Sequence, residues 1–100
     1  MIKHIAMFKF KTFESELEKE NFYERLKKAF DGLDKTIPEI KSLQLGFDKL
    51  HTEASFDFIV NIEIENLDAI NAYANHAEHI KAVSVIKEMA TDRKVIDYEF

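Results

Sequence analysis

Cysteine is absent from this 100-residue chain. The protein can therefore form no disulfide bond, and it has neither a thiolate nucleophile nor a cysteine-ligated metal site. Small domains in oxidising compartments commonly depend on disulfides for stability. The absence of cysteine thus favours a cytoplasmic protein.

Glycine and proline are also scarce, with two glycines and one proline in the whole chain. A phosphate-binding loop needs several glycines close together, so none is predicted, and no redox cofactor has a recognisable motif here. We therefore expect no cofactor. With 46% hydrophobic and 33% charged residues and no linker-like segment, the composition predicts one compact domain over residues 1–100.

The chain contains neither a long apolar run nor a cluster of basic residues. Near the N-terminus a lysine interrupts the apolar residues every few positions, which argues against a signal peptide or a membrane span. The net charge is -5. Because nucleic-acid surfaces need concentrated positive charge, we expect neither nucleic acid nor a membrane as a partner.

The periodicity of the apolar residues predicts the secondary structure. A period of two indicates strands, and spacings of three and four indicate helices. The expected strands are 2–11, 40–47, 56–65 and 94–100, and the expected helices are 16–35, 67–75 and 78–90. Asn75, a poor helix former, favours a break near His76. The order β-α-β-β-α-β, with its second helix split, predicts an α+β, ferredoxin-like fold with helices on one face of a four-stranded antiparallel sheet.

The other face of the predicted sheet is unusually apolar. Its apolar residues come from three strands: Ile5, Met7, Ile59, Ile96, Tyr98 and Phe100. An antiparallel sheet that is covered on one side only should be polar on the other. Two copies that pack sheet to sheet would cover these residues, so we expect a homodimer with a barrel-like interface.

The segment Tyr73-Ala-Asn-His76-Ala-Glu-His79 carries the main candidates for chemistry. On a continuous helix each of the three rings would lag the previous one by about 60°. Tyr73 and His79 can share a face only if the helix breaks between them. An inward-facing His79 would be a titratable ring in an apolar setting, which suits acid-base chemistry near neutral pH.

Several motifs in order along the chain carry a resemblance to a known family. They are the opening Met1–Lys11, Ile37-Pro38, Gly46, the Tyr73–His79 segment and the ending Asp92–Tyr98. Over almost its whole length the chain resembles the stress-responsive dimeric α/β barrel family, often called Dabb. The resemblance implies a ferredoxin-like protomer and a dimer, but it implies no single activity. Many members have no assigned reaction and are linked only loosely to stress responses.

Some plant members of that family are cofactor-free polyketide cyclases, and their general base, tyrosine and aspartate match His79, Tyr73 and Asp97. The chain departs from the family pattern in two ways. Ala77 replaces the usual proline, and Phe30 and Phe58 stand where cyclase-like members carry polar groups. The resemblance thus implies a more apolar pocket here and leaves the substrate open.

Each candidate residue also has a structural interpretation. Asp97 shares the helix-facing side of its strand with Val95, where a carboxylate needs a partner. We expect that partner to be His79, with a pKa above 6.5 unless desolvation dominates. A purely structural ion pair would have the same sequence pattern. Tyr73 could donate to an oxyanion or simply fill the core, and His4 is expected to line or orient the site.

A metal site is not predicted. His76 and His79 have a permitted ligand spacing, but zinc needs at least a third protein ligand, and only carboxylates such as Glu78 or Asp97 could supply it. His76 is expected to face solvent or the helix break, and His51 to lie in a polar loop, without roles in the site.

Two function classes remain open. In the first interpretation a homodimer binds a small hydrophobic or aromatic molecule between sheet and helices, in a stress response. In the alternative it is a cofactor-free cyclase or lyase in which His79 is the base, Asp97 orients it and Tyr73 stabilises the oxyanion. The residues expected to line the pocket are His4, Ala6, Phe8, Phe30, Phe58, Val60 and Val83. A pocket of a few hundred Å³ that opens onto His79 would favour the enzyme, and a closed core would favour the first class.

Overall fold

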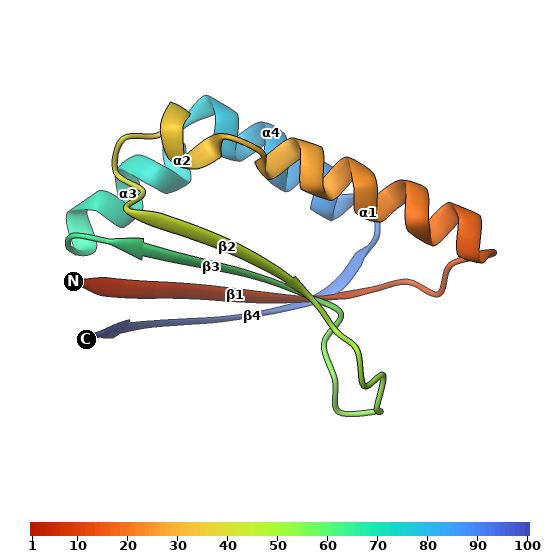
Figure 1. Cartoon of the computed structure of the whole chain (residues 1–100). Coiled ribbons are helices and arrows are strands. Elements are labelled where there is room, and N and C mark those ends of the chain that lie inside the picture. Colours follow the sequence, from red (N-terminus) through yellow and green to blue (C-terminus); the bar gives the residue numbers. More distant parts are fainter.

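The computed structural model describes residues 1–100 and has helices on one face of a four-stranded antiparallel sheet (Figure 1). The strands are β1 (Ile2–Phe10), β2 (Ser42–Phe47), β3 (Phe58–Ile64) and β4 (Ala90–Glu99), and the helices are α1 (Glu16–Phe30), α2 (Leu33–Thr36), α3 (Leu67–Asn75) and α4 (Ala77–Lys87). In the sheet the strand order is β2-β3-β1-β4. The predicted order and the ferredoxin-like fold are confirmed. No helix has the length and apolar character needed to cross a membrane.

The core lies between the sheet and the helices and follows the alternation of the strands. In β1 every second residue, from Ile2 to Phe10, is buried, and β3 alternates in the same way. Aromatic rings of the two strands pack together, with Phe10 and Phe58 stacked at a centroid distance of 6.1 Å. His4 is the one buried polar residue. The even-numbered residues of β1, from Ile2 to Phe10, therefore form its inward face.

The predicted helix over 16–35 is wrong in its second part. α1 ends at Phe30, and a separate short helix, α2, follows after Gly32. Gly32 has φ 71°, in the left-handed region that glycine enters without a steric penalty. The helical spacing of apolar residues continues through Leu33, which is buried, and it hid this change of direction.

The boundary between the last helix and the last strand also differs from the prediction. α4 ends at Lys87 and β4 begins at Ala90, whereas the sequence placed these limits near 90 and 94. Ile80 has the helical spacing of an inward-facing residue, with Val83 and Ile86, but it is 57% exposed. The inward face of α4 is instead formed by Ala82 and Ile86, which are buried.

The predicted break between the two C-terminal helices is confirmed at His76. Its backbone is extended, with φ -68° and ψ 135°, and it both ends α3 and begins α4. The His76 Nδ1 atom accepts a hydrogen bond from the backbone N–H of Glu78 at 3.1 Å. Asn66 caps α3 in the same manner, through Ala69. Histidine thus takes the capping role that Ser, Asp or Asn commonly fills.

The second face of the sheet carries no helix (Figure 1). On this open face Ile5 lies opposite Ile96 across β1 and β4, and Met7 lies opposite Ile59 across β1 and β3. Ile96 is 56% exposed and Phe100 is 58% exposed. Exposed apolar side chains on neighbouring strands are typical of a protein interface rather than of a free surface.

Candidate functional site

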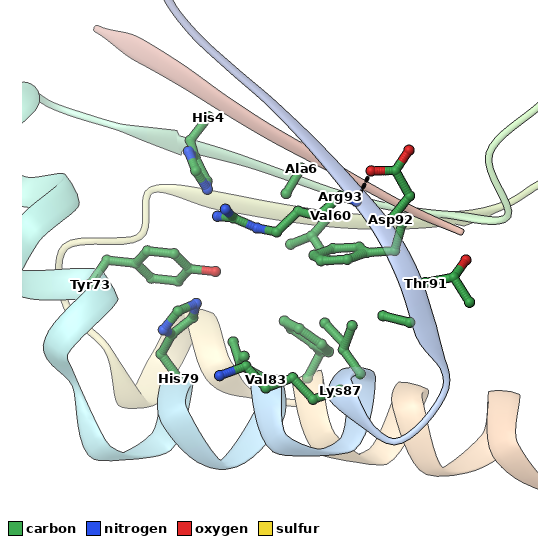
Figure 2. A pocket seen from close by; sticks show the side chains of 14 residues that line it. His4, Ala6, Val60, Tyr73, His79, Val83, Lys87, Thr91, Asp92 and Arg93 are labelled. Carbon is green, nitrogen blue, oxygen red and sulfur yellow. Dashed lines mark hydrogen bonds between the residues drawn. The ribbon is translucent and has the colours of Figure 1, made fainter. Parts of the chain in front are cut away.

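A cavity of ≈ 560 Å³ lies between the sheet and α4 (Figure 2). Six of the side chains expected to line a pocket do line this cavity: His4, Ala6, Phe8, Phe30, Val60 and Val83. Phe58 does not, because it is buried beneath them and packs on Phe8, Phe30 and Phe47. The aromatic side chains therefore leave a space that falls in the size range of small-molecule sites.

His79 and Tyr73 meet on one wall of this cavity. Their ring centroids are 4.2 Å apart, although they are six positions apart in the sequence and a continuous helix would carry them about 9 Å apart along its axis. The break at His76 turns α4 so that His79 points back toward Tyr73 (Figure 2).

The hydrogen bonds of His79 define its chemical state. Its Nδ1 atom lies 3.1 Å from the carbonyl oxygen of Ala74. A carbonyl can only accept, so Nδ1 donates and carries the hydrogen of the neutral ring. Burial lowers the pKa of His79 from its usual 6.5, and the nearby charges of His4 and Arg93 lower it further. The neutral ring then holds a free lone pair on Nε2, as a general base requires.

Tyr73 keeps its proton. It is 3% exposed, and burial raises the pKa of its hydroxyl to about 12. The ring also packs edge-on against His4, at a centroid distance of 5.9 Å. A protonated phenol in an apolar wall is a hydrogen-bond donor, the group suited to a carbonyl or a developing oxyanion.

Asp97 is paired with His4 rather than with His79, so the predicted pairing is wrong. The Asp97 Oδ1 atom and the His4 Nδ1 atom form a hydrogen bond, with the side chain of His4 11% exposed and that of Asp97 33% exposed. The two residues lie directly opposite each other in the β1 and β4 register. Cross-strand neighbours point to the same face of the sheet, so Asp97 reaches His4 before it can reach α4.

His79 consequently lacks the carboxylate that would have raised its pKa. Asp97 does not line the cavity, whereas His4 does. The His79 pKa was expected to lie above 6.5 unless desolvation dominated. Desolvation does dominate here, so the pKa is lowered. The hydrogen bond from His4 to Asp97 fixes the orientation of the His4 ring, which forms part of the cavity wall.

Four polar residues of the cavity were not singled out from the sequence: Lys87, Thr91, Asp92 and Arg93. A signal for Arg93 was present, because strand alternation places it on the same face as Val95 and Asp97. The structure pairs it across the sheet with buried Phe8. Lys87 and Thr91 could not be assigned in advance, since the end of α4 was placed three residues too late.

The structure contains no group of three or more histidine, aspartate or glutamate side chains that could hold a metal ion. The ring of His76 is used as a helix cap and His79 bonds to Ala74, so these two rings do not converge. His51 lies in the exposed β2–β3 loop beside Asp48.

Comparison with known families decides the classification. Residues 2–100 match the family model of the stress responsive A/B barrel domain, or Dabb. The chain belongs to the Dabb family. The predicted family is thereby confirmed over nearly the whole chain.

Relatives of this Dabb protein include one named enzyme and several proteins of unknown function. Olivetolic acid cyclase of Cannabis sativa is 27% identical over 99 residues, which cover 97% of this chain and 94% of the cyclase. A dimeric protein of unknown function with a ferredoxin-like fold, from Bacteroides fragilis, is 30% identical, with a TM-score of 0.89 and coverage of 99% and 95% of the two chains. A dimeric ferredoxin-like protein from Thermobifida fusca is 27% identical, with a TM-score of 0.83 and coverage of 99% and 90%. The family does not define one activity, and the specific function of this Dabb protein is undetermined.

Proposed function

We propose that this Dabb protein is a cytoplasmic homodimer that binds a small hydrophobic or aromatic molecule in the cavity beneath α4. The observation that carries the proposal is the cavity itself, ≈ 560 Å³ with 8 hydrophobic residues among its 14 lining residues. Sites for small molecules are concave, mostly apolar and equipped with a few polar groups that orient the ligand. Tyr73, His79 and Arg93 supply those groups at one end.

The dimer is supported by the open sheet face and by the relatives. Two solved proteins with 30% and 27% identity are dimeric and share the fold. The exposed Ile96, Tyr98 and Phe100 need a cover. A second sheet of the same composition offers one through a two-fold interface.

A cavity-filling variant tests ligand binding. N-phenyl-1-naphthylamine, an uncharged dye that fluoresces in apolar sites, serves as the probe. Val83→Phe adds a ring inside the cavity and should weaken dye binding at least about tenfold, because losing about 60 Å² of apolar contact costs about 1.5 kcal/mol. Fluorescence titration measures the change.

Ile80→Phe is the matched control, since it adds the same ring to the same helix at a side chain that is 57% exposed and outside the cavity. It should leave the dye affinity within about twofold of wild type. Equal losses in both variants, or no dye binding by the wild-type protein, would reject the cavity as the binding site.

A second candidate function, the enzyme, is favoured by the state of His79 and by its place in the lining of the ≈ 560 Å³ cavity, which is the observation expected to favour this alternative. A neutral imidazole with a free Nε2 atom beside a protonated phenol is suited to removing a proton next to a carbonyl group and stabilising the enolate that forms. The relationship to olivetolic acid cyclase supports this acid-base chemistry. In this candidate His79 is the base and Tyr73 the oxyanion donor, while Asp97 acts through His4.

A further inference from the structure

Arg93 is the one arginine of the chain whose guanidinium has no partner. The sequence contains two arginines. Arg25 forms a bidentate pair with Glu88, in which the Nη1 to Oε1 distance is 2.7 Å. None of the six ion pairs includes Arg93, and its one hydrogen bond with a side chain is donated by its backbone N–H and not by the guanidinium. Its five guanidinium N–H donors are therefore free.

The free guanidinium is directed into the cavity. Arg93 lies opposite Phe8 in the β1 and β4 register, so both side chains leave the sheet on the helix side. Figure 2 shows the side chain extending from β4 into the space between His4 and Tyr73. Burial raises the pKa of Tyr73 and the Arg93 charge opposes that rise, while for His79 the same charge adds to the lowering of the pKa by burial, as expected for a cation near both rings.

No carboxylate neutralises this cation inside the cavity. Asp92 is the only acidic residue in the lining, and its Oδ1 atom accepts the backbone N–H of Arg93 at 2.8 Å. Its carboxylate turns away from the guanidinium (Figure 2). Lys87 adds a second cation to the lining. The cavity wall thus has an excess of positive charge in a protein whose net charge is -5.

We infer that Arg93 is an anion-recognition residue, and that the ligand is a small amphiphile with an apolar body and one anionic oxygen group. The class comprises carboxylates, sulfonates, phenolates and stabilised enolates. The apolar part would lie against Phe8, Phe30 and Val60, and the anionic group would meet the guanidinium beside the Tyr73 hydroxyl. Arginine suits this role because its planar fork bonds two oxygens at once. The inference rests on the proposed ligand site and adds the charge of the ligand.

A pair of dyes that differ in one charged group tests the inference. 1-Anilinonaphthalene-8-sulfonate has the same rings as N-phenyl-1-naphthylamine and adds a sulfonate. The wild-type protein should bind the sulfonate dye more tightly than the uncharged dye. Arg93→Gln should weaken sulfonate binding about tenfold to a hundredfold, as expected for loss of a hydrogen bond to a charged group. It should change the affinity for the uncharged dye less than about twofold.

Lys28→Gln is the control for net charge, because Lys28 is exposed on α1, forms no ion pair and lies outside the cavity. It should leave both affinities within about twofold. If Lys28→Gln weakens sulfonate binding as much as Arg93→Gln, or if Arg93→Gln weakens both dyes equally, Arg93 does not recognise the anion. Those results leave the cavity proposal standing, whereas failure of the uncharged dye to bind the wild-type protein overturns both.

Discussion

At the scale of single residues, the chemistry of the site depends on which histidine forms a hydrogen bond with the Asp97 carboxylate. Sequence alternation correctly placed His4 and Asp97 on the helix side of the sheet, and the resemblance brought Tyr73 and His79 into consideration. The pairing of Asp97 with His4 was not foreseen, because it depends on the β1 and β4 register. Register follows from pairing across the whole sheet and cannot be obtained from one strand.

The structure predicts that His79 titrates below its usual pKa of 6.5 and independently of Asp97. Burial is the main cause of the lowering, and Asp97 bonds to His4 instead. In an NMR titration, Asp97→Asn should shift the ring resonances of His4 and leave the His79 midpoint unchanged. A His79 midpoint above 6.5 that falls in Asp97→Asn would restore the originally expected pair.

The same titration defines the pH range of the acid-base candidate. A base must be unprotonated, so exchange of the α-proton of a β-dicarbonyl probe with solvent deuterium should be constant above pH 6.5 and decline as the pH falls through the lowered His79 pKa. His79→Gln should slow the exchange at least about a hundredfold. Asn71→Asp, an exposed change on α3, is a control that should retain the rate. Equal rates in wild type and His79→Gln would leave ligand binding as the function.

At the scale of secondary-structure elements, the positions that end a helix were harder to foresee than the helices themselves. The split of the second helical region was predicted from Asn75 and lies at His76. The division between α1 and α2 was missed, because Gly32 interrupts neither the apolar spacing nor the charge pattern. A single glycine within a helical pattern carries little signal unless its φ is known.

Gly32→Ala should destabilise the protein by about 1 to 2 kcal/mol, since a side chain at φ 71° is strained. No heavy atom lies within 4 Å of the added Cβ, so the cost comes from the backbone alone. A loss of about 1 kcal/mol lowers the melting temperature of a domain of this size by about 4 to 8 °C. Gly32→Asn should cost less, because asparagine tolerates the left-handed region. Equal stability of Gly32→Ala and wild type in urea unfolding would contradict the assigned conformation.

At the scale of the whole molecule, the open sheet face is the feature that the sequence predicted best. By strand alternation six apolar residues face away from the core, which indicated that a partner covers them. The structure leaves that face without a helix. Successive side chains of a strand point to opposite faces of the sheet, so this alternation can be recognised in each strand without knowledge of the fold. The cavity could not be predicted in this way, because its volume depends on how Phe8, Phe30 and Phe58 pack together.

The double variant Met7→Glu with Ile59→Glu should convert the proposed homodimer to a monomer. These side chains are opposite each other on the open face, and two unpaired charges would be buried in each copy of the interface. Light scattering after size exclusion measures the mass. Leu17→Glu with Ile80→Glu is the control, with the same charge change on exposed helical residues. A dimer that survives the first pair, or dissociates equally in both, would place the interface elsewhere.

The kink at His76 also bears on how the site can change during evolution. One pair of backbone angles, φ -68° and ψ 135°, separates the helix that carries Tyr73 from the helix that carries His79. Changing these angles would move His79 relative to Tyr73, but it would also move Ala82 and Ile86, the buried residues of the same helix. The spacing of the two rings is therefore coupled to the packing of the core. A mutation that re-aims His79 through this joint carries a cost in stability, so the core limits how far the site can change in this way.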